Sequence, residues 1–260
     1  MWGGSLTHSA STAPQQLKAL ADFSGLDYDL SASLISTHTY TNLGGSDLNV
    51  VSNNLEYDKP TPYPASYKQF TDIPHLSSTL RTDTLYNMSV ELGASTPDGR
   101  RQFEMSMTYE NDLELLERTY ALFNATKPQI KNAKDIVWLL IFEPIPVQLT
   151  SRSLPKGGNV LGLESNTKPL MLVLVQAIWA NEEDDDNIIG TMKGLFRDIQ
   201  GAARDAGKLN RYQYLNYADE SQDPISTYGP ANKAFLQVVS RKYDPQGFWQ
   251  KAAPGGFKLF

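Results

Sequence analysis

The sequence contains no cysteine and only three histidines among its 260 residues. Without cysteine the chain can form no disulfide, no thiolate nucleophile and no cysteine-ligated zinc site. The histidines, His8, His38 and His75, show neither His-x-His nor His-Glu-x-x-His spacing. We therefore expect no metal site.

Basic clusters and long apolar runs are also missing. The net charge is −6, whereas a nucleic-acid-binding surface needs clustered lysine and arginine. The longest apolar stretch, 170–179, is too short to cross a bilayer. No basic segment followed by an apolar one comes after Met1, so we see no signal peptide. The sequence predicts no nucleic-acid partner, no membrane partner and a cytoplasmic location.

What is present is the composition of an ordinary globular protein. Apolar residues make up 40% of the chain and charged residues 20%. A chain of this length can bury a substantial core in one large domain or two small ones.

Hydrophobic periodicity predicts strands interleaved with amphipathic helices. Alternating and near-continuous apolar patterns predict strands at 5–9, 34–40, 48–57, 103–109, 136–142, 170–179 and 213–217. Helical spacing predicts helices at 13–23, 113–123, 187–203 and 230–243. Strands and helices do not alternate regularly, so a doubly wound parallel sheet is not expected. The prediction is an α+β fold: a broad, mostly antiparallel sheet of about six or seven strands with helices on one face. The other face is then free to line a pocket or to meet another domain.

Five stretches together resemble a known family, in order and over the whole chain. They are WGGSLTHS (2–9), FEPIP (142–146), GGNVLGLE (157–164), YLNYADESQDP (214–224) and VSRKYDPQGFW (239–249). They resemble the fungal berberine bridge enzyme-like branch of the FAD-linked oxidases, whose FAD domain is of the p-cresol methylhydroxylase type.

The resemblance covers only part of that family's architecture. In the family a larger N-terminal region binds FAD, a substrate domain follows, and a final segment braces the FAD domain. Residues 1–213 resemble the substrate domain and residues 214–260 the final segment, while the FAD domain has no counterpart. The glycine pairs 44–45 and 157–158 lack dinucleotide-binding spacing and are predicted to be turns. We therefore expect no cofactor, unless a partner chain supplies the FAD-binding domain.

Tyr217 is the sharpest candidate for catalysis. The resemblance implies that the second tyrosine of Tyr-Leu-Asn-Tyr is the family's usual catalytic base, and Tyr214 is a second candidate. A tyrosine with its ordinary pKa of about 10 is a poor base at neutral pH unless a neighbour stabilises the phenolate. Alternatively, these tyrosines pack the end of a strand. Asn216 could orient a substrate carbonyl.

Two further groups of residues are candidates on predicted strands. His38 and Tyr40 share one strand face, where His38 could act in catalysis and Tyr40 could bind substrate. A structural role for this histidine is the simpler interpretation. Met105 and Met107 either belong to the core or form an apolar pocket wall that binds substrate.

Two polar residues complete the candidates. Some relatives carry a catalytic glutamate on the strand that matches 170–179, but residues 171–173 are apolar here. Gln176 remains as a polar, substrate-binding candidate on that strand. Glu143 ends a predicted buried strand and is either an acid with a raised pKa or a carboxylate at the sheet rim in water.

Three functional hypotheses follow. The first is a flavin-free enzyme of secondary metabolism that cyclises or isomerises an apolar metabolite, including pericyclic, Diels–Alder-type addition, by shape and hydrogen bonding. The alternatives are a fragment or subunit of an FAD-dependent oxidoreductase completed by another chain, and a non-catalytic metabolite-binding protein. Loss of a docked domain would expose apolar surface, which predicts a homodimer through the vacated face.

Overall fold

The computed structural model describes residues 1–260 except 26, 44 and 95–97. Its strands form one sheet in the order β4-β1-β3-β2-β7-β8-β6-β9, with β5 also paired to β1. The strands are β1 (Trp2–Ser9), β2 (Ala32–Leu43), β3 (Ser46–Tyr57), β4 (Ser77–Ser78), β5 (Arg81–Thr82), β6 (Arg101–Glu110), β7 (Val137–Ile145), β8 (Leu170–Trp179) and β9 (Leu209–Asn210). All of their pairings are antiparallel.

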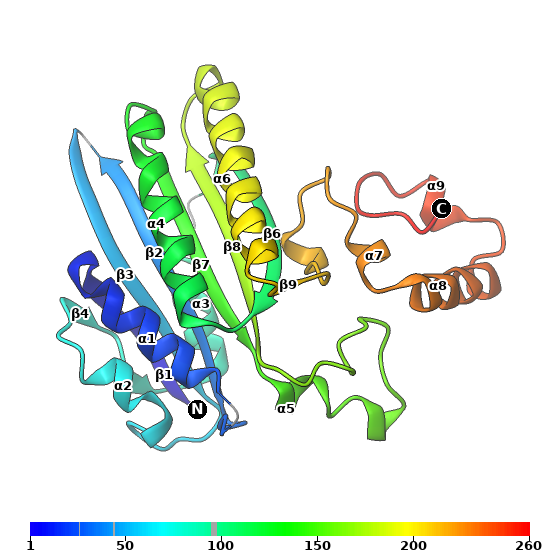
Figure 1. The fold of residues 1–260 in the computed structure, drawn as a ribbon, viewed down its shortest axis with the longest axis horizontal. Coiled ribbons are helices and arrows are strands. Elements are labelled where there is room, and N and C mark those ends of the chain that lie inside the picture. Colours follow the sequence, from blue (N-terminus) through cyan, green and yellow to red (C-terminus); the bar gives the residue numbers. More distant parts are fainter. Residues whose placement is uncertain (26, 44, 95–97) are drawn as a thin grey trace.

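Helices cover one face of this sheet, which confirms the predicted α+β class. Helices α1 (Ala13–Phe23), α4 (Leu113–Ile130) and α6 (Asp185–Asp205) lie side by side over that face (Figure 1). The remaining helices are α2 (Lys68–Thr71), α3 (Leu85–Gly93), α5 (Val147–Thr150), α7 (Pro224–Thr227), α8 (Pro230–Tyr243) and α9 (Phe248–Lys251). The described sheet has nine strands rather than the six or seven predicted. The two-residue strands β4, β5 and β9 pair along the sheet edges and are too short to produce an alternating pattern.

The starts of the long helices follow from local chemistry. The Asp112 side chain accepts a hydrogen bond from the Leu115 amide at 3.0 Å and so caps α4. Acidic residues 182–186 precede and open α6, where they interact favourably with the positive end of the helix dipole. The acidic run therefore has a structural explanation that needs no metal.

Alternation along the central strands determines which side chains meet the helices. In β7 the buried residues Trp138, Leu140 and Phe142 join the core between sheet and helices. The intervening positions point to the opposite face, because successive strand residues face opposite ways. We call that opposite side the open face. On β8 even the open-face residues Leu172 and Leu174 are buried, which confirms that this strand is covered on both sides.

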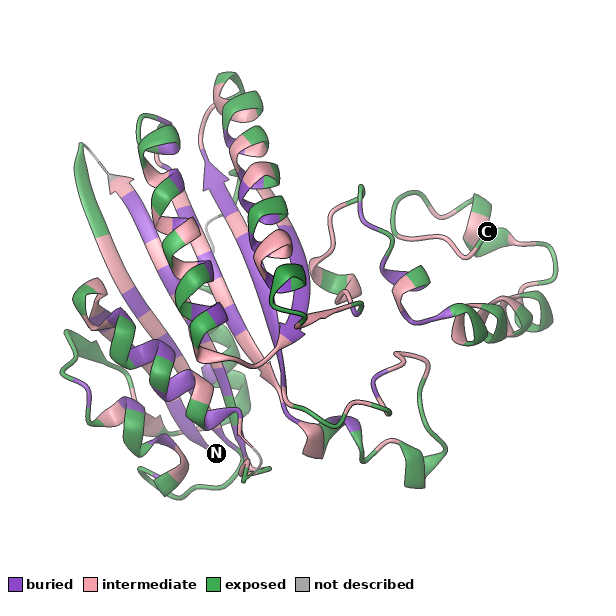
Figure 2. Cartoon of the chain, in the orientation of Figure 1, coloured by how far each residue is buried: buried purple, intermediate pink, exposed green. Residues whose placement is uncertain are grey.

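The C-terminal part of the chain turns onto the open face instead of adding the strand predicted at 213–217. Gln222 holds this segment to β6: its side chain accepts from the Ser106 amide at 3.1 Å and donates to the Ser106 carbonyl at 2.8 Å. The Ser106 hydroxyl also donates to the Tyr214 carbonyl at 3.3 Å. Residues Leu215–Tyr217 consequently form a single 3₁₀ turn against the sheet. Beyond it, α8 lies apart from the sheet and has no buried residue (Figures 1 and 2).

Candidate functional site

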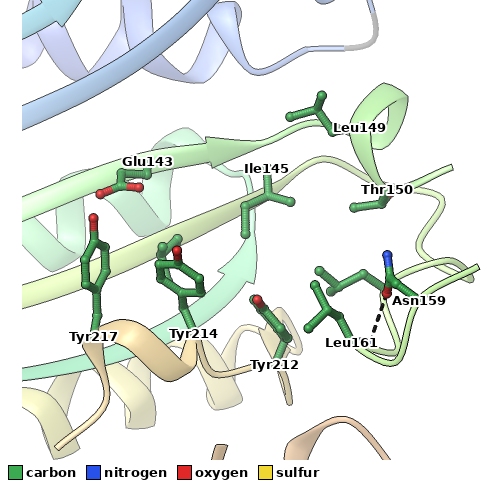
Figure 3. A pocket seen from close by; sticks show the side chains of 11 residues that line it. Glu143, Ile145, Leu149, Thr150, Asn159, Leu161, Tyr212, Tyr214 and Tyr217 are labelled. Atoms are coloured by element: carbon green, nitrogen blue, oxygen red, sulfur yellow. Dashed lines mark hydrogen bonds between the residues drawn. The ribbon is translucent and has the colours of Figure 1, made fainter. Parts of the chain in front are cut away.

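A pocket of about 320 Å³ lies on the open face, where β7 and β8 meet the C-terminal segment. Figure 3 shows a row of tyrosines on one side of it and the end of β7 on the other. The lining residues are Glu143, Ile145, Leu149, Thr150, Asn159, Leu161, Leu163, Leu172, Tyr212, Tyr214 and Tyr217.

Glu143 and Tyr217 form the polar end of this pocket. Glu143 occupies an open-face position on β7, directly opposite Leu172 of β8. Tyr217 ends the 3₁₀ turn, and its hydroxyl points at the Glu143 carboxylate (Figure 3). Each group shifts the pKa of the other, so the carboxylate and the hydroxyl interact across the polar end of the pocket. This pairing, which joins two distant segments of the chain, is the main chemical feature of the site.

The electrostatics of the pair indicate which group holds the proton. Burial raises the pKa of Glu143, and the facing Tyr217 hydroxyl only partly offsets this effect. Burial first, and then the nearby negative charge of Glu143, raise the pKa of Tyr217. Tyr217 is therefore a hydrogen-bond donor at neutral pH, because its neighbour disfavours the phenolate that a catalytic base would require. Glu143 is the better proton acceptor of the two.

Tyr214 lies beside Tyr217, but Asn216 points elsewhere. The Tyr214 and Tyr217 rings pack edge to face with centroids 4.9 Å apart. Asn216 is exposed and donates to the Tyr214 hydroxyl at 2.9 Å. The structure thus brings the two candidate tyrosines together in the pocket and leaves Asn216 outside its lining.

Gln176 lies on the open face but also outside the pocket lining. Its amide donates to Glu104 on β6 at 3.0 Å. Burial raises the pKa of Glu104, and the charge of Glu104 contributes to the raised pKa of Tyr217. Gln176 therefore holds a second carboxylate near Tyr217 and does not line the pocket itself.

His38 and Tyr40 lie on the opposite, helix-covered face of the sheet. The His38 ring packs 4.8 Å from Tyr120 of α4 and 5.7 Å from Phe142, measured between centroids. The Tyr40 hydroxyl donates to Asp47 at 2.9 Å. The structure does not bring either residue to Tyr217, so the expected catalytic role of His38 and substrate-binding role of Tyr40 find no support in its geometry. Even-numbered positions of β2 simply face the helices, and a structural role for His38 fits this placement.

Met105 and Met107 share this covered face. They are 7% and 2% exposed and belong to the core between sheet and helices. Neither lines the pocket. The core interpretation of the methionine pair is the one that the structure supports.

Several pocket residues were not singled out from the sequence, although Asn159 and Leu161 lie in the GGNVLGLE stretch that carries the family resemblance. Thr150, Asn159 and Leu161 come from the long connection between β7 and β8, which has no hydrophobic period. The Leu161 amide donates to the Asn159 side chain at 2.9 Å, and this contact shapes the loop at the pocket (Figure 3). Tyr212 is buried and stacks on Tyr228 with centroids 6.1 Å apart.

The two glycine pairs do not form a pyrophosphate-binding loop in the described residues. A pyrophosphate-binding glycine loop connects a strand to the N-terminus of a helix. Gly45 has φ 86° and leads directly into β3, while its neighbour in the pair, residue 44, lies outside the described residues. Gly157 and Gly158, with φ 98° and 77°, lead through a loop into β8. Neither position opens a helix, so both glycine sites act as turns.

Metal sites and membrane-spanning helices were both sought among the described residues. Within them no three histidine, aspartate or glutamate side chains lie close enough together to hold a metal ion. None of the helices there combines the length and apolar character needed to span a membrane.

Comparison with curated proteins finds relatives along the whole chain. The FAD-dependent monooxygenase drtC of Aspergillus calidoustus is 33% identical over 263 residues, which cover 100% of this chain and 50% of that protein. The FAD-dependent monooxygenase sdcF of Emericella nidulans is 31% identical, with coverage of 100% and 54%. The bifunctional solanapyrone synthase of Alternaria solani is 25% identical, with coverage of 100% and 49%. The chain spans about half the length of each of these relatives. No family model matches it.

Solved structures share the fold over the same extent. Aclacinomycin oxidoreductase superimposes with a TM-score of 0.62 at 13% identity, covering 97% of this chain and 54% of that one. The carbohydrate oxidase of Microdochium nivale gives 0.60 at 15% identity, with coverage of 95% and 53%. BBE-like 1 of Physcomitrella patens gives 0.61 at 15% identity, with coverage of 94% and 51%. The resemblance carried by the sequence motifs is confirmed: this chain corresponds in fold to about half of a berberine bridge enzyme-like, FAD-linked oxidase.

Proposed function

We propose that this chain is the substrate-binding half of an FAD-linked oxidoreductase of secondary metabolism. The observation that carries the proposal is the Glu143–Tyr217 pair at the polar end of a pocket lined mainly by leucine, isoleucine and tyrosine side chains. Relatives that match the whole chain are described as FAD-dependent monooxygenases, which supports this class of reaction. The substrate we propose is a small, largely apolar metabolite with an acidic hydroxyl, such as a phenol or an enol.

The lining of the pocket supports this substrate class. Leu161, Leu163 and Leu172 offer apolar surface, and the tyrosine rings offer flat faces on which an aromatic ring can pack. At the polar end the Glu143 carboxylate accepts a hydrogen bond or proton from the substrate hydroxyl. Tyr217 donates to a substrate oxygen and so orients it. Positioning and general-base assistance of this kind are typical roles of pocket side chains.

These residues act on the substrate and its proton only. A flavin supplied by another part of the protein, or by another chain, would accept the electrons of the oxidation. This chain's part is to exclude water from the apolar pocket, to fix the substrate's orientation and to hold its proton at Glu143.

Binding of a phenol tests the proposed site. We expect 4-ethylphenol, titrated into the protein, to shift the NMR signals of Tyr214 and Tyr217 and to leave that of Tyr40 unchanged. Tyr40 serves as an internal control because it lies on the covered face. Binding should strengthen as pH rises through the raised pKa of Glu143, because the carboxylate is the form that accepts the phenol's hydrogen bond. Shifts confined to tyrosines outside the pocket would refute the proposal.

Cofactor-free cyclisation is a second candidate function. Its support is that this chain alone forms both the apolar pocket and the Tyr217 donor, and that a relative matching the whole chain is called a synthase. Turnover of a polyketide-like precursor by colourless, flavin-free protein would favour it over oxidation. A requirement for bound flavin would exclude it.

The homodimer was predicted through the face vacated by the FAD domain, and we propose the C-terminal helices, which lie apart from the sheet, as a second candidate surface for it. Phe235, Val238, Phe248 and Trp249 are 58%, 59%, 58% and 66% exposed on α8 and α9. Exposed large apolar side chains favour association. We expect light scattering to give the mass of a dimer, and a Phe248→Ser, Trp249→Ser variant to shift it towards the monomer. A monomeric wild-type protein at high concentration would contradict the expectation.

A further inference from the structure

The sheet divides at the end of β7. Pairing between β2 and β7 runs from Thr41 and Val137 to Ser36 and Phe142 and stops there. Beyond that point β2 remains paired with β3 as far as Ala32, and β7 remains paired with β8 as far as Ile145. The two strands therefore separate while each keeps its other neighbour.

Pro144 explains the division. If the register continued, Pro144 would lie opposite Leu34. The backbone of β7 alternates in direction, and Ile136, which has the same parity as Pro144, accepts from the Asn42 amide of β2 at 3.4 Å. Position 144 would therefore have to donate an N–H to β2, and proline has none. The missing hydrogen bond ends the ladder at this residue.

A second pocket, of about 580 Å³, occupies the division. Its walls include Leu34 and Ser33 of β2, Glu56 of β3 and Pro144 of β7. The first and second pockets share Leu149 of α5 as a wall. Leu149 is 51% exposed and lies across Ile145 from Tyr212 (Figure 3). The two pockets are thus neighbours around the end of one strand.

The second pocket is suited to an extended, mostly apolar group. Leu30, Leu34 and Leu85 contribute apolar walls, and the rim carries the Ser33 hydroxyl and the Glu56 carboxylate. Both pockets carry a half-buried glutamate, and no lysine or arginine lines the second one. An alkyl arm that ends in a hydroxyl could therefore be accommodated.

We propose that the two pockets form one bipartite substrate site, in which the phenol or enol head lies at Glu143 and Tyr217 and an alkyl arm passes Leu149 into the division between β2 and β7. This inference rests on the proposed function for the placement of the head. It assigns the substrate class as elongated molecules with an apolar arm.

Chain-length dependence of binding tests the inference. Each fully buried methylene favours binding by about fourfold. Partial burial and ordering of the arm reduce the gain, so we expect 4-heptylphenol to bind wild-type protein about 50-fold more tightly than 4-ethylphenol, measured by NMR titration. Ser33→Trp fills the second pocket from an exposed position on β2 and should reduce this ratio to below about fivefold. Ser89→Trp, at an exposed position of α3 that lines neither pocket, is the bulk-matched control and should leave the ratio unchanged.

A backbone variant tests the cause of the division independently. Pro144→Ala restores a backbone N–H that can donate to β2, so we expect β2 and β7 to pair further and to fill the second pocket. The affinity of 4-heptylphenol relative to that of 4-ethylphenol should then fall as it does in Ser33→Trp. If both variants keep the wild-type ratio, the second pocket does not hold the arm and the inference is overturned. If 4-ethylphenol leaves Tyr214 and Tyr217 unshifted while heptylphenol binding remains sensitive to Ser33→Trp, the proposed acid–base site fails and the second pocket stands. If neither phenol binds, both are overturned.

Discussion

Glu143→Gln is expected to lower kcat/KM of the flavin-loaded enzyme by about 10²- to 10⁴-fold, the usual range for loss of a general base. Glutamine keeps the shape of the side chain but cannot take the substrate's proton. Wild-type activity should rise with pH through the raised pKa of Glu143, and this limb of the pH profile should vanish in the variant. The measurement is the pH dependence of kcat/KM with a phenolic substrate.

Tyr217→Phe separates the roles of the two partners. The substitution removes a hydrogen-bond donor but leaves the proton acceptor in place. We therefore expect a smaller loss of kcat/KM, about 10- to 100-fold, and we expect activity still to rise with pH as in the wild type. Tyr217 lowers the pKa of Glu143, so removing its hydroxyl should also move the rise in activity to higher pH. Tyr86→Phe is the matched control, because Tyr86 is exposed on α3 and lines neither pocket, and it should leave activity within about threefold. A Tyr217→Phe variant that loses the pH limb would instead identify Tyr217 as the base.

His38→Phe is expected to make the protein more resistant to acid. His38 is fully buried under α4, and its two ring nitrogens have no hydrogen-bond partner in the described structure. Burial, followed by the positive charge of Lys127, lowers its pKa to about 3. An unfolded histidine has a pKa near 6.5, so the unfolded state binds the proton more readily. Wild-type stability is therefore lost as pH falls from about 6.5 towards about 3, by up to about 5 kcal/mol.

Phenylalanine has no proton to gain and leaves no unpaired nitrogen in the core. We expect the variant to gain about 1–3 kcal/mol at pH 7 from removal of the unsatisfied groups. Its advantage over wild type should grow as pH falls, as measured by urea unfolding at a series of pH values. His38→Leu provides a second variant in case the larger ring strains the contacts with Tyr120 and Phe142. Parallel pH curves for wild type and both His38 variants would refute the explanation.

Together these experiments separate the two faces of the sheet. The open face carries the polar pair and the pocket, so variants there should alter binding and turnover with little effect on stability. The covered face carries His38, Tyr40 and the methionines, so variants there should alter stability first. Activity loss in His38→Phe without loss of stability would restore the catalytic role first considered for this histidine.

The sequence alone determined the class of fold and the central strands. Strict alternation in 103–109 and continuous apolar runs in 136–142 and 170–179 leave few ways to bury the side chains except in a broad sheet. The motifs from FEPIP to VSRKYDPQGFW likewise established the resemblance to half of an FAD-linked oxidase. These signals are local, because each depends on the spacing of residues within one short segment.

Only the tertiary structure decided which residues share a site. Alternation along β2 placed His38 and Tyr40 on the same face. Both faces of this strand carry residues of mixed polarity, so the sequence did not indicate which face the helices cover. Glu143 and Tyr217 meet because Gln222 fastens the C-terminal segment to β6, and nothing in the sequence of either segment encodes that contact. Which side of a strand the helices cover, and which distant segment folds over the other side, depend on packing of the whole chain. Periodicity within a segment reports only that two faces exist.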